Sequence, residues 1–356
     1  MIYTEFDPLQ EVIVGDCYNP GDLDWALPKE TLLGFNKILE ETKEDLNNLS
    51  DFLIKSNIKV HRPEVIKYKK EFDLVNFKVN FPICPIVPRD QYIVIGDTIL
   101  QTYTSYTDRY FDSLSYSKIF TQLFKEGYNW LSSPPPILKD LINIDNWYTR
   151  KDIYSDLLKE QLLFHTAVMF KAGDSVIYNG TGPGSKRGLN WVKRNLPDIR
   201  FIENEGTITD NYGHIDHGFI LINDETVIHN NIDWVPLCLR NKNLIDVGKY
   251  LPPLNFEKYV NEYKQTGGKY SMSYLESYLN NWRGFSQEVC FDLNVLILDS
   301  NNILFNREIP ELFKYLKTLN INSHCIPQRH SLYWEGGVHC LTLDIKRKGT
   351  KRRIIS

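Results

Sequence analysis

The stretch Tyr92-Ile-Val-Ile-Gly-Asp-Thr-Ile-Leu100 consists of an apolar run, a Gly-Asp turn and a second apolar run. Two β-rich runs separated by a short, polar, glycine-bearing break predict a β-hairpin. The same pattern recurs in residues 168–178, 218–229 and 294–305. Recurrence of one such unit predicts structural repeats whose sequences have diverged.

Helical patterns lie between these hairpins. Residues 33–55 and 116–126 carry apolar side chains three and four positions apart, and residues 309–319 begin with a proline in the first turn. The sequence therefore predicts a mixed α/β protein. With 356 residues, 42% of them hydrophobic, the chain can bury a large core. The repeats favour one domain over residues 1–356 rather than two.

Composition excludes several classes of protein. No apolar run approaches the roughly 20 residues that span a bilayer, and no basic, apolar targeting segment follows Met1. The six cysteines form no CxxC pair, which argues against zinc and fits a reducing compartment. A net charge of -4 gives no indication of nucleic-acid binding, which usually needs an excess of positive charge. We expect a soluble, cytoplasmic protein with no metal, organic cofactor, nucleic acid or membrane partner.

A thiol stands near the end of the chain, in Gly336-Gly-Val-His-Cys340, just before an alternating apolar run. The two glycines let the backbone approach a bound ligand closely, and His339 adds polarity that a structural cysteine does not need. Cys340 is therefore a candidate nucleophile. This segment alone favours the other interpretation, a small buried hydrophobe, because buried cysteine is common and only a thiol with a lowered pKa reacts.

A second candidate segment, His214-Ile-Asp216, stands at the start of another apolar run. The two-residue period of a strand places His214 and Asp216 on one face. A thiol nucleophile needs a base, and later an acid for the departing amine, and one imidazole can serve both steps. Asp216 could orient that imidazole or bind a cation. Without further context, the pair is explained equally well by a structural histidine at a strand end whose ring nitrogens are hydrogen-bonded.

Taken in order along nearly the whole chain, these and other segments resemble the glycine amidinotransferase family of the guanidine-modifying superfamily. The segments that carry the resemblance are Glu5-Phe-Asp-Pro-Leu-Gln-Glu-Val-Ile-Val-Gly15, Val87-Pro-Arg-Asp90, Ile93-Val-Ile-Gly96, Arg109-Tyr-Phe111, Lys125-Glu-Gly-Tyr-Asn-Trp130, Phe170-Lys-Ala-Gly173, Asn190-Trp-Val-Lys-Arg-Asn-Leu196, His214-Ile-Asp216, Asn294-Val-Leu-Ile-Leu-Asp299 and the Gly336–Cys340 segment. The resemblance implies the pentein fold, an α/β-propeller of five ββαβ-type units around a pseudo-fivefold axis, with the active site in the central channel.

The resemblance also implies roles for individual residues. Cys340 attacks the central carbon of a guanidinium group and His214 protonates the departing amine, which leaves a covalent amidino-cysteine. A second amine then takes the amidino group, with the same histidine acting as base. Asp90 and Asp216 match family carboxylates that hydrogen-bond guanidinium nitrogens, and Asn211 matches a polar residue of the site. Without the family, Asp90 is better explained as a residue that caps a turn.

Two positions depart from the family pattern. His165 stands where the family has an aspartate that pairs with the guanidinium and supports the catalytic histidine. Loss of a carboxylate from a desolvated cation site costs roughly several kcal/mol, so the guanidinium pocket is expected to be weaker. Asp233 stands near the place of the family's arginine for a substrate carboxylate, and an aspartate there favours an amine or a second cation instead.

Three functions remain open on this basis. The first is an amidinotransferase of specialised metabolism that acts on atypical small-molecule substrates. The second is a Cys-His acyl transferase forming thioesters or amides, in which His165 is a catalytic donor to an oxyanion. The third is a binding protein that has lost catalysis. The family also suggests a homodimer.

Overall fold

The structure is a computed structural model that describes residues 1–68, 72–74, 77–79, 83–104, 109–136, 160–180, 186–205, 214–251 and 293–356. Five three-stranded sheets form its framework, and β3 (Phe72–Leu74) with β4 (Phe77–Val79) forms a separate two-stranded sheet. The mixed α/β class predicted from the sequence is confirmed. The asparagine predicted for the site at position 211 lies outside the described residues.

Each three-stranded sheet contains an antiparallel strand pair and a third strand parallel to the central strand. In one unit β5 (Tyr92–Ile95) pairs with β6 (Thr98–Gln101), and β6 pairs in parallel with β7 (Asn129–Ser132). A parallel neighbour needs a crossover connection. Helix α2 (Asp112–Lys125) supplies it here, so the unit has the order ββαβ.

Three further units follow along the chain. They consist of β8 (Met169–Ala172), β9 (Ser175–Tyr178), α4 (Lys186–Asn195) and β10 (Arg200–Glu203); β11 (Phe219–Leu221), β12 (Thr226–His229) and β13 (Asn243–Asp246); and β14 (Leu296–Asp299), β15 (Asn302–Phe305), α7 (Pro310–Thr318) and β16 (Asn322–Cys325). All four hairpins expected from the sequence are present. In the β11–β13 unit two short 3-10 helices, η7 (Ile232–Trp234) and η8 (Leu237–Leu239), stand in place of the crossover α-helix.

The fifth unit is assembled from both ends of the chain. Strand β17 (Thr342–Arg347) pairs antiparallel with β1 (Leu9–Val14), and β1 pairs in parallel with β2 (Lys59–His61) after the crossover helix α1 (Lys29–Lys55). The two chain ends also meet the β8–β9 turn, because Thr4 bridges to Ala172 and Arg353 bridges to Gly173. The fifth ββαβ-type unit is thus completed by long-range pairing.

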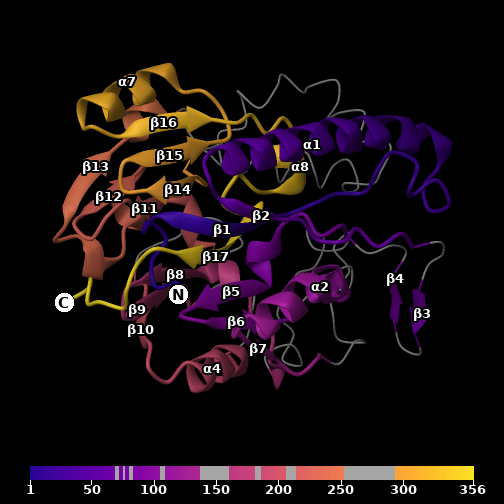
Figure 1. Ribbon diagram of the computed structural model, residues 1–356, viewed down its shortest axis with the longest axis horizontal. Coiled ribbons are helices and arrows are strands. Elements are labelled where there is room, and N and C mark those ends of the chain that lie inside the picture. Colours follow the sequence, from indigo (N-terminus) through magenta and orange to yellow (C-terminus); the bar gives the residue numbers. More distant parts are fainter. Residues whose placement is uncertain are drawn as a thin grey trace.

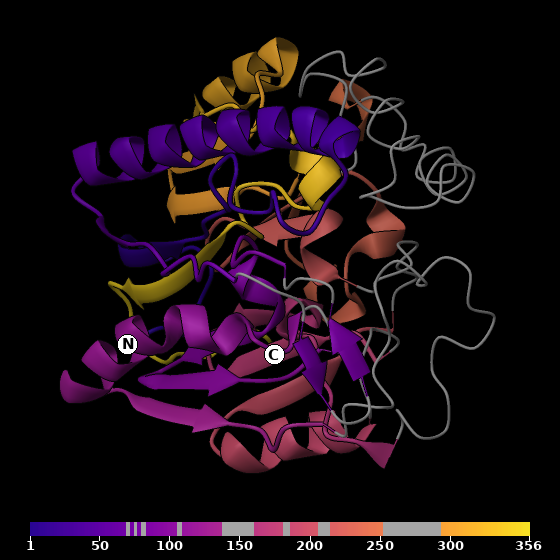
Figure 2. The same cartoon turned by 90° about the vertical axis from the view of Figure 1, so that its right-hand side faces the viewer.

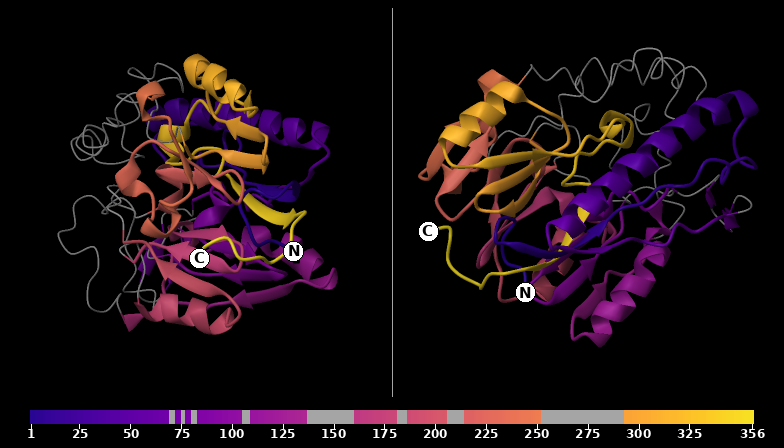
Figure 3. Two further views of the ribbon diagram at one scale, coloured as in Figure 1. Left: turned by 90° about the vertical axis from the view of Figure 1, so that its left-hand side faces the viewer. Right: turned by 45° about the horizontal axis from the view of Figure 1, so that its top comes forward.

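The strands β1, β17, β5 and β6 lie between the helices α1 and α4, whereas β3 and β4 lie at one edge of the molecule (Figure 1). Helices α1 and α7 lie on one side and α4 lies on the opposite side, as the turned view also shows (Figure 2). The strands β1 and β17 lie side by side in the middle (Figure 3). In the described part of the chain no helix combines the length and apolarity that a membrane span needs.

Candidate active site

Cys340 lies in the turn between the short helix α8 (Ser331–Trp334) and β17, and only 1% of the residue is exposed. Helix α8 ends at Glu335 in the left-handed conformation, with φ of 58°. A Cβ atom on Gly336 would come within 2.8 Å of the Cys340 Cβ, and one on Gly337 within 2.7 Å of the Asn294 carbonyl oxygen. The glycine pair therefore allows close packing around the thiol itself, whereas the sequence suggested an approach to a ligand.

Asn294 holds the thiol in place from the loop before β14. Its Nδ2 donates to the Cys340 Sγ at 3.1 Å and to Asp216 Oδ2 at 2.7 Å, while its Oδ1 accepts from the Cys340 backbone N–H at 3.0 Å. The asparagine is fully buried. One amide side chain thus fixes both the cysteine and the carboxylate next to it.

Asp216 is the carboxylate beside the thiol, with its Oδ2 3.5 Å from the Cys340 Sγ. The same oxygen lies 2.6 Å from His339 Nδ1. Burial alone would raise the pKa of Asp216, but the hydrogen bond from His339 and the nearby histidines, led by His217, hold this pKa well below its usual value. Asp216 is therefore an anion at neutral pH.

The environment of Cys340 opposes thiolate formation when no substrate is bound. Burial, followed by the negative charges of Asp216 and Asp90, raises the pKa of the thiol well above its usual value, and the hydrogen bond from Asn294 and the charge of Arg89 offset only part of this. Cys340 is therefore a protonated thiol at neutral pH. A cation placed against the two carboxylates would reverse this effect.

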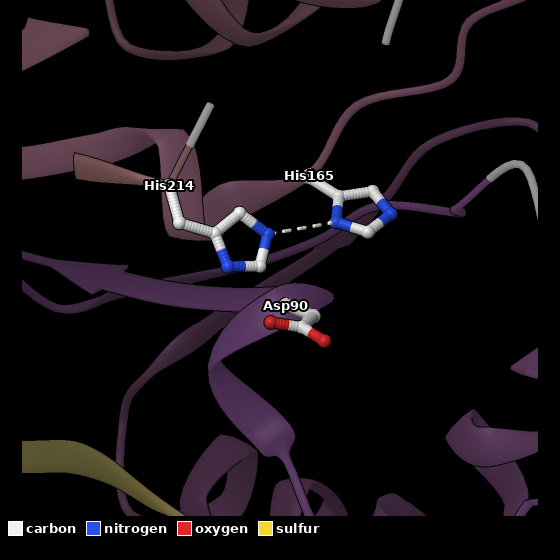
Figure 4. Close-up of side chains that lie close together, drawn as sticks. All are labelled: Asp90, His165 and His214. Atoms are coloured by element: carbon white, nitrogen blue, oxygen red, sulfur yellow. Dashed lines mark hydrogen bonds between the residues drawn. The ribbon is translucent and has the colours of Figure 1, made fainter. Parts of the chain in front are cut away.

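Asp90, His165 and His214 form a second group of the site and lie close together (Figure 4). Asp90 ends the 3-10 helix η1 (Pro88–Asp90), while His165 and His214 each directly precede a 3-10 helix, η5 (Thr166–Val168) and η6 (Ile215–His217). His214 Nε2 lies 3.5 Å from His165 Nδ1. All three side chains are buried.

Arg109 sets the charge of this second group. Its Nη1 donates to Asp90 Oδ2, and its Nε donates to Asp112 Oδ2 at 2.9 Å. Burial would raise the pKa of Asp90, but the charge and hydrogen bond of Arg109, together with the neighbouring His214 and His165, lower this pKa below its usual value. Burial lowers the pKa of His165 to about 3, against the opposing charge of Asp90. At neutral pH Asp90 is therefore an anion and His165 a neutral imidazole.

A buried ion network supports the thiol segment from behind. Arg89 Nε donates to the His339 carbonyl oxygen at 2.9 Å, and its Nη2 lies 3.1 Å from Asp344 Oδ1. Glu5 lies 3.1 Å from Lys171 Nζ and 3.5 Å from His339 Nε2. These contacts tie the N-terminal segment, β8 and β17 together, so the position of His339 depends on segments far apart in the sequence.

The structure brings together five of the residues proposed from the sequence: Cys340, His214, His165, Asp90 and Asp216. Asp233 is different, because it is exposed on η7, where its backbone N–H donates to Asn231 Oδ1. Sequence reasoning assigned no role to Asn294, Arg109, Arg89 or Glu5. All four stand in segments that resemble the family, and Asn294 directly precedes an apolar run, as His214 does, which is the signal that could have indicated it.

No family model matches the chain. Inosamine-phosphate amidinotransferase 1 of Streptomyces griseus is 23% identical to it over 361 residues, which cover 97% of this chain and 96% of that protein. An amidinotransferase of the saxitoxin biosynthetic pathway from Microseira wollei has a TM-score of 0.72 at 20% identity, covering 99% of both chains. DDAH from Pseudomonas aeruginosa has a TM-score of 0.55 at 9% identity, covering 95% of this chain and 99% of that one.

The five ββαβ-type units and these structural neighbours define a protein with the pentein fold. Within that fold class the chain is similar in sequence to amidinotransferases over nearly the whole length of both chains.

Proposed function

We propose that the chain is an amidinotransferase of specialised metabolism, which moves an amidino group from a guanidine donor to an amine through a covalent intermediate on Cys340. The observation that carries the proposal is the ionised carboxylate of Asp216, held 3.5 Å from the thiol sulfur in a buried site. An anion so close to a nucleophile is unfavourable until a cation binds. A planar guanidinium, which pairs with carboxylates through two N–H groups, is such a cation.

The donor itself would activate the thiol. Opposite charges about 4 Å apart attract by roughly 4 kcal/mol at an effective dielectric constant of about 20. That attraction favours the thiolate over the thiol, so it lowers the pKa of Cys340. The raised pKa of the buried thiol then falls only when a guanidinium lies between Asp90 and Asp216. The site would thereby limit side reactions of a free thiolate.

The chemical steps follow from these positions. The Cys340 proton passes to His214, and the thiolate attacks the central guanidinium carbon to form a C–S bond. His214 returns the proton to the departing nitrogen as the C–N bond breaks, which leaves an amidino-cysteine and a free amine. The acceptor amine then attacks the same carbon and His214 takes its proton. The C–S bond breaks to release the thiolate, which receives that proton from His214 and is restored to the thiol. Proton and electron pairs balance over the cycle.

The acyl-transfer alternative has one supporting feature, the neutral imidazole of His165, which can donate a hydrogen bond. The carboxylates argue against it, because acyl transfer develops an oxyanion and both Asp90 and Asp216 are anions. Repulsion between the oxyanion and Asp216 would have the same magnitude as the attraction calculated for a guanidinium. The electrostatics of the site therefore favour amidino transfer.

The test is intact-protein mass spectrometry of the wild type, Cys340→Ala and Cys325→Ala after incubation with arginine and, separately, with acyl thioesters. Cys325 is a half-buried thiol on β16 and serves as the matched control. We expect an adduct of amidino mass in the wild type and in Cys325→Ala, and none in Cys340→Ala. An acyl adduct without an amidino adduct would support the alternative, and activity retained by Cys340→Ala would remove the nucleophile assignment.

The donor and acceptor classes, a single domain over residues 1–356, a homodimer and a cytoplasmic location remain predictions of the same proposal. Light scattering coupled to size-exclusion chromatography tests the homodimer. The exposed Asp233 enters this proposal only as a contact for an amine or a second cation. Replacing it with asparagine is expected to raise the KM for the acceptor and to leave adduct formation from the donor unchanged.

A further inference from the structure

Asp90, His165 and His214 place one carboxylate oxygen and two imidazole nitrogens within 4.8 Å of one another. The two nitrogens that face each other are His165 Nδ1 and His214 Nε2, and the carboxylate lies beside both rings (Figure 4). All three residues are at least nine-tenths buried. Two imidazoles and one carboxylate are a ligand set that divalent transition metals, zinc above all, bind in proteins.

The separation of the two nitrogens fits a shared metal ion. Zinc lies about 2.0–2.1 Å from imidazole nitrogens, so two such ligands of a tetrahedral ion are roughly 3.3 Å apart. The His165 and His214 nitrogens are 3.5 Å apart. A good N–H···N hydrogen bond would bring them closer, to about 3 Å. An ion between the rings therefore needs only a small adjustment of the side chains.

We propose that Asp90, His165 and His214 form a binding site for a divalent transition-metal ion of the zinc class, with water as the fourth ligand. The ion competes with catalysis, since its bond to His214 Nε2 occupies the lone pair that must accept and return the proton. Only this inhibitory effect rests on the proposed function. Metal binding itself can be measured without turnover.

Arg109 orients the carboxylate of Asp90. Its Nη1 donates to Oδ2 of Asp90, which leaves the other carboxylate oxygen as a ligand atom. Metal-binding carboxylates are commonly held by such hydrogen bonds from neighbouring side chains. The positive charge of Arg109 opposes a nearby cation, but Asp112 pairs with the same guanidinium at 2.9 Å and reduces that repulsion.

A neighbouring group, His214 with Asp216 and His217, has similar spacing but fits an ion less well. Oδ2 of Asp216 already accepts hydrogen bonds from Asn294 and lies 2.6 Å from His339 Nδ1. Its Oδ1 lies 3.7 Å from His217 Nε2, and His217 is only half-buried. Because both groups share His214, His217 provides a matched control for His165.

The experiment is a titration of the metal-free full chain with CoCl2, followed by its visible absorption, and a competition titration with ZnCl2 and a chromogenic chelator. The proteins are the wild type, His165→Asn, Asp90→Asn and His217→Asn, each checked for folding by circular dichroism. We expect one ion per chain with four-coordinate cobalt bands in the wild type and His217→Asn. Affinity should fall at least tenfold in His165→Asn and in Asp90→Asn.

Two results would overturn the site: a wild type that binds neither cobalt nor zinc in the micromolar range, or binding lost in His217→Asn and retained in His165→Asn. Cys340→Ala separates this proposal from the proposed function, because it should bind cobalt as the wild type does while forming no amidino adduct. If an adduct forms but no metal binds, only the metal site fails. If metal binds but no adduct forms, only the amidinotransferase fails.

Discussion

Asn294 shows how a single buried side chain can determine whether a thiol is usable. It contacts the sulfur, the backbone N–H of the cysteine and the neighbouring carboxylate at distances of 2.7–3.1 Å. Without it, Asp216 and the Cys340 backbone would lose partners in a buried site, and each unsatisfied buried group costs about 1–3 kcal/mol. We infer that Asn294 is a positioning residue for the nucleophile.

Replacing Asn294 with alanine should therefore lower the rate of adduct formation by about 10²-fold, the usual effect of a misplacement near 1 Å. Asn306 provides a matched control, because it is also a buried asparagine and its Nδ2 donates to Ser331 Oγ at 3.4 Å. Asn306→Ala should lose stability but keep a rate near that of the wild type. Rates are read from time courses of intact mass, and equal rates in the two variants would contradict the positioning role.

His165 should also make the folded state sensitive to acid. Its pKa is about 3 in the folded chain, against about 6.5 in an unfolded one. As pH falls through 6.5, the unfolded state therefore takes up the proton first, and stability that is complete above pH 6.5 is lost progressively towards pH 3. Between pH 6.5 and 5 the loss is about 2 kcal/mol.

The comparison that isolates this group is urea unfolding of the wild type and His165→Asn at pH 7 and pH 5. We expect the decrease in unfolding free energy to be about 2 kcal/mol smaller in the variant. Asp112, whose pKa burial raises to about 6 against the opposing charge of Arg109, acts with the opposite sign, but it is present in both proteins. An equal decrease in the two proteins would show that His165 is not held neutral.

The site was predictable from the sequence only where residue type and local context coincide. Cys340, His214 and Asp216 stand beside glycines or at the start of apolar runs, so local pattern marks them. The bond between His339 and Asp216 joins residues 123 positions apart, and that between Arg89 and the His339 carbonyl joins residues 250 positions apart. These long-range hydrogen bonds form only when distant units pack together, so no local spacing in the sequence predicts them.

At the scale of elements, the turn between β8 and β9 does more than reverse the chain. Gly173 has a positive φ of 74°. Its backbone N–H donates to the Tyr3 carbonyl oxygen at 2.7 Å, and the backbone N–H of Asp174 donates to the Arg352 carbonyl oxygen at 2.7 Å. A Cβ atom on Gly173 would lie 2.1 Å from the Arg352 carbonyl oxygen. The turn therefore requires glycine for both its conformation and its contacts.

Gly173→Ala should destabilise the chain much more than Gly127→Ala. Gly127 has a positive φ of 100°, and a Cβ atom there would have no neighbouring atom within 4 Å. Alanine at this position therefore costs only the backbone strain of a positive φ, about 1–2 kcal/mol. At Gly173 the clash with backbone adds about 1–3 kcal/mol. Urea unfolding of both variants measures the difference, and equal losses would show that the chain ends do not depend on this turn.

The elements themselves were predicted well where an amphipathic or apolar period is sustained. The helix expected over residues 33–55 begins earlier, at Lys29, because Pro28 is its N-cap and Glu30 lies in its first turn. The crossover between β12 and β13 has no helical period, and the structure forms η7 and η8 there. Hairpins depend on neighbouring residues, whereas the length of a crossover also depends on the distance it must span.

For the molecule as a whole, hairpin patterns could not predict that one unit is assembled from both chain ends. The antiparallel partner of β1 is β17, which lies more than 300 residues further along the sequence. The family resemblance supplied the five-unit arrangement, and the pairing of β17 with β1 shows how the structure achieves it. Since Thr4 and Arg353 both contact the β8–β9 turn, the two ends lie close together. This proximity has a direct test.

A circular permutant that joins residue 356 to residue 1 and opens the chain between Ser300 and Asn301 should fold and form the Cys340 adduct. The opened turn is exposed and lies between β14 and β15. A flexible linker of about 10 residues spans roughly 17 Å, enough for ends that meet one turn. A chain cut after residue 341 should fail to fold, and a folded, reactive truncation would show that β17 is dispensable. Circular dichroism and intact mass are the measurements.

The pairing of β17 with β1 also bears on synthesis of the chain at the ribosome. Among the described strands β17 is the last to leave the exit tunnel, and β1 must wait for it with one edge unpaired. Cys340 lies two residues before β17, so its thiol reaches Asn294 and Asp216 only as the first strand gains its partner. We therefore expect a nascent chain to hold no correctly placed Cys340 thiol until β17 has been translated.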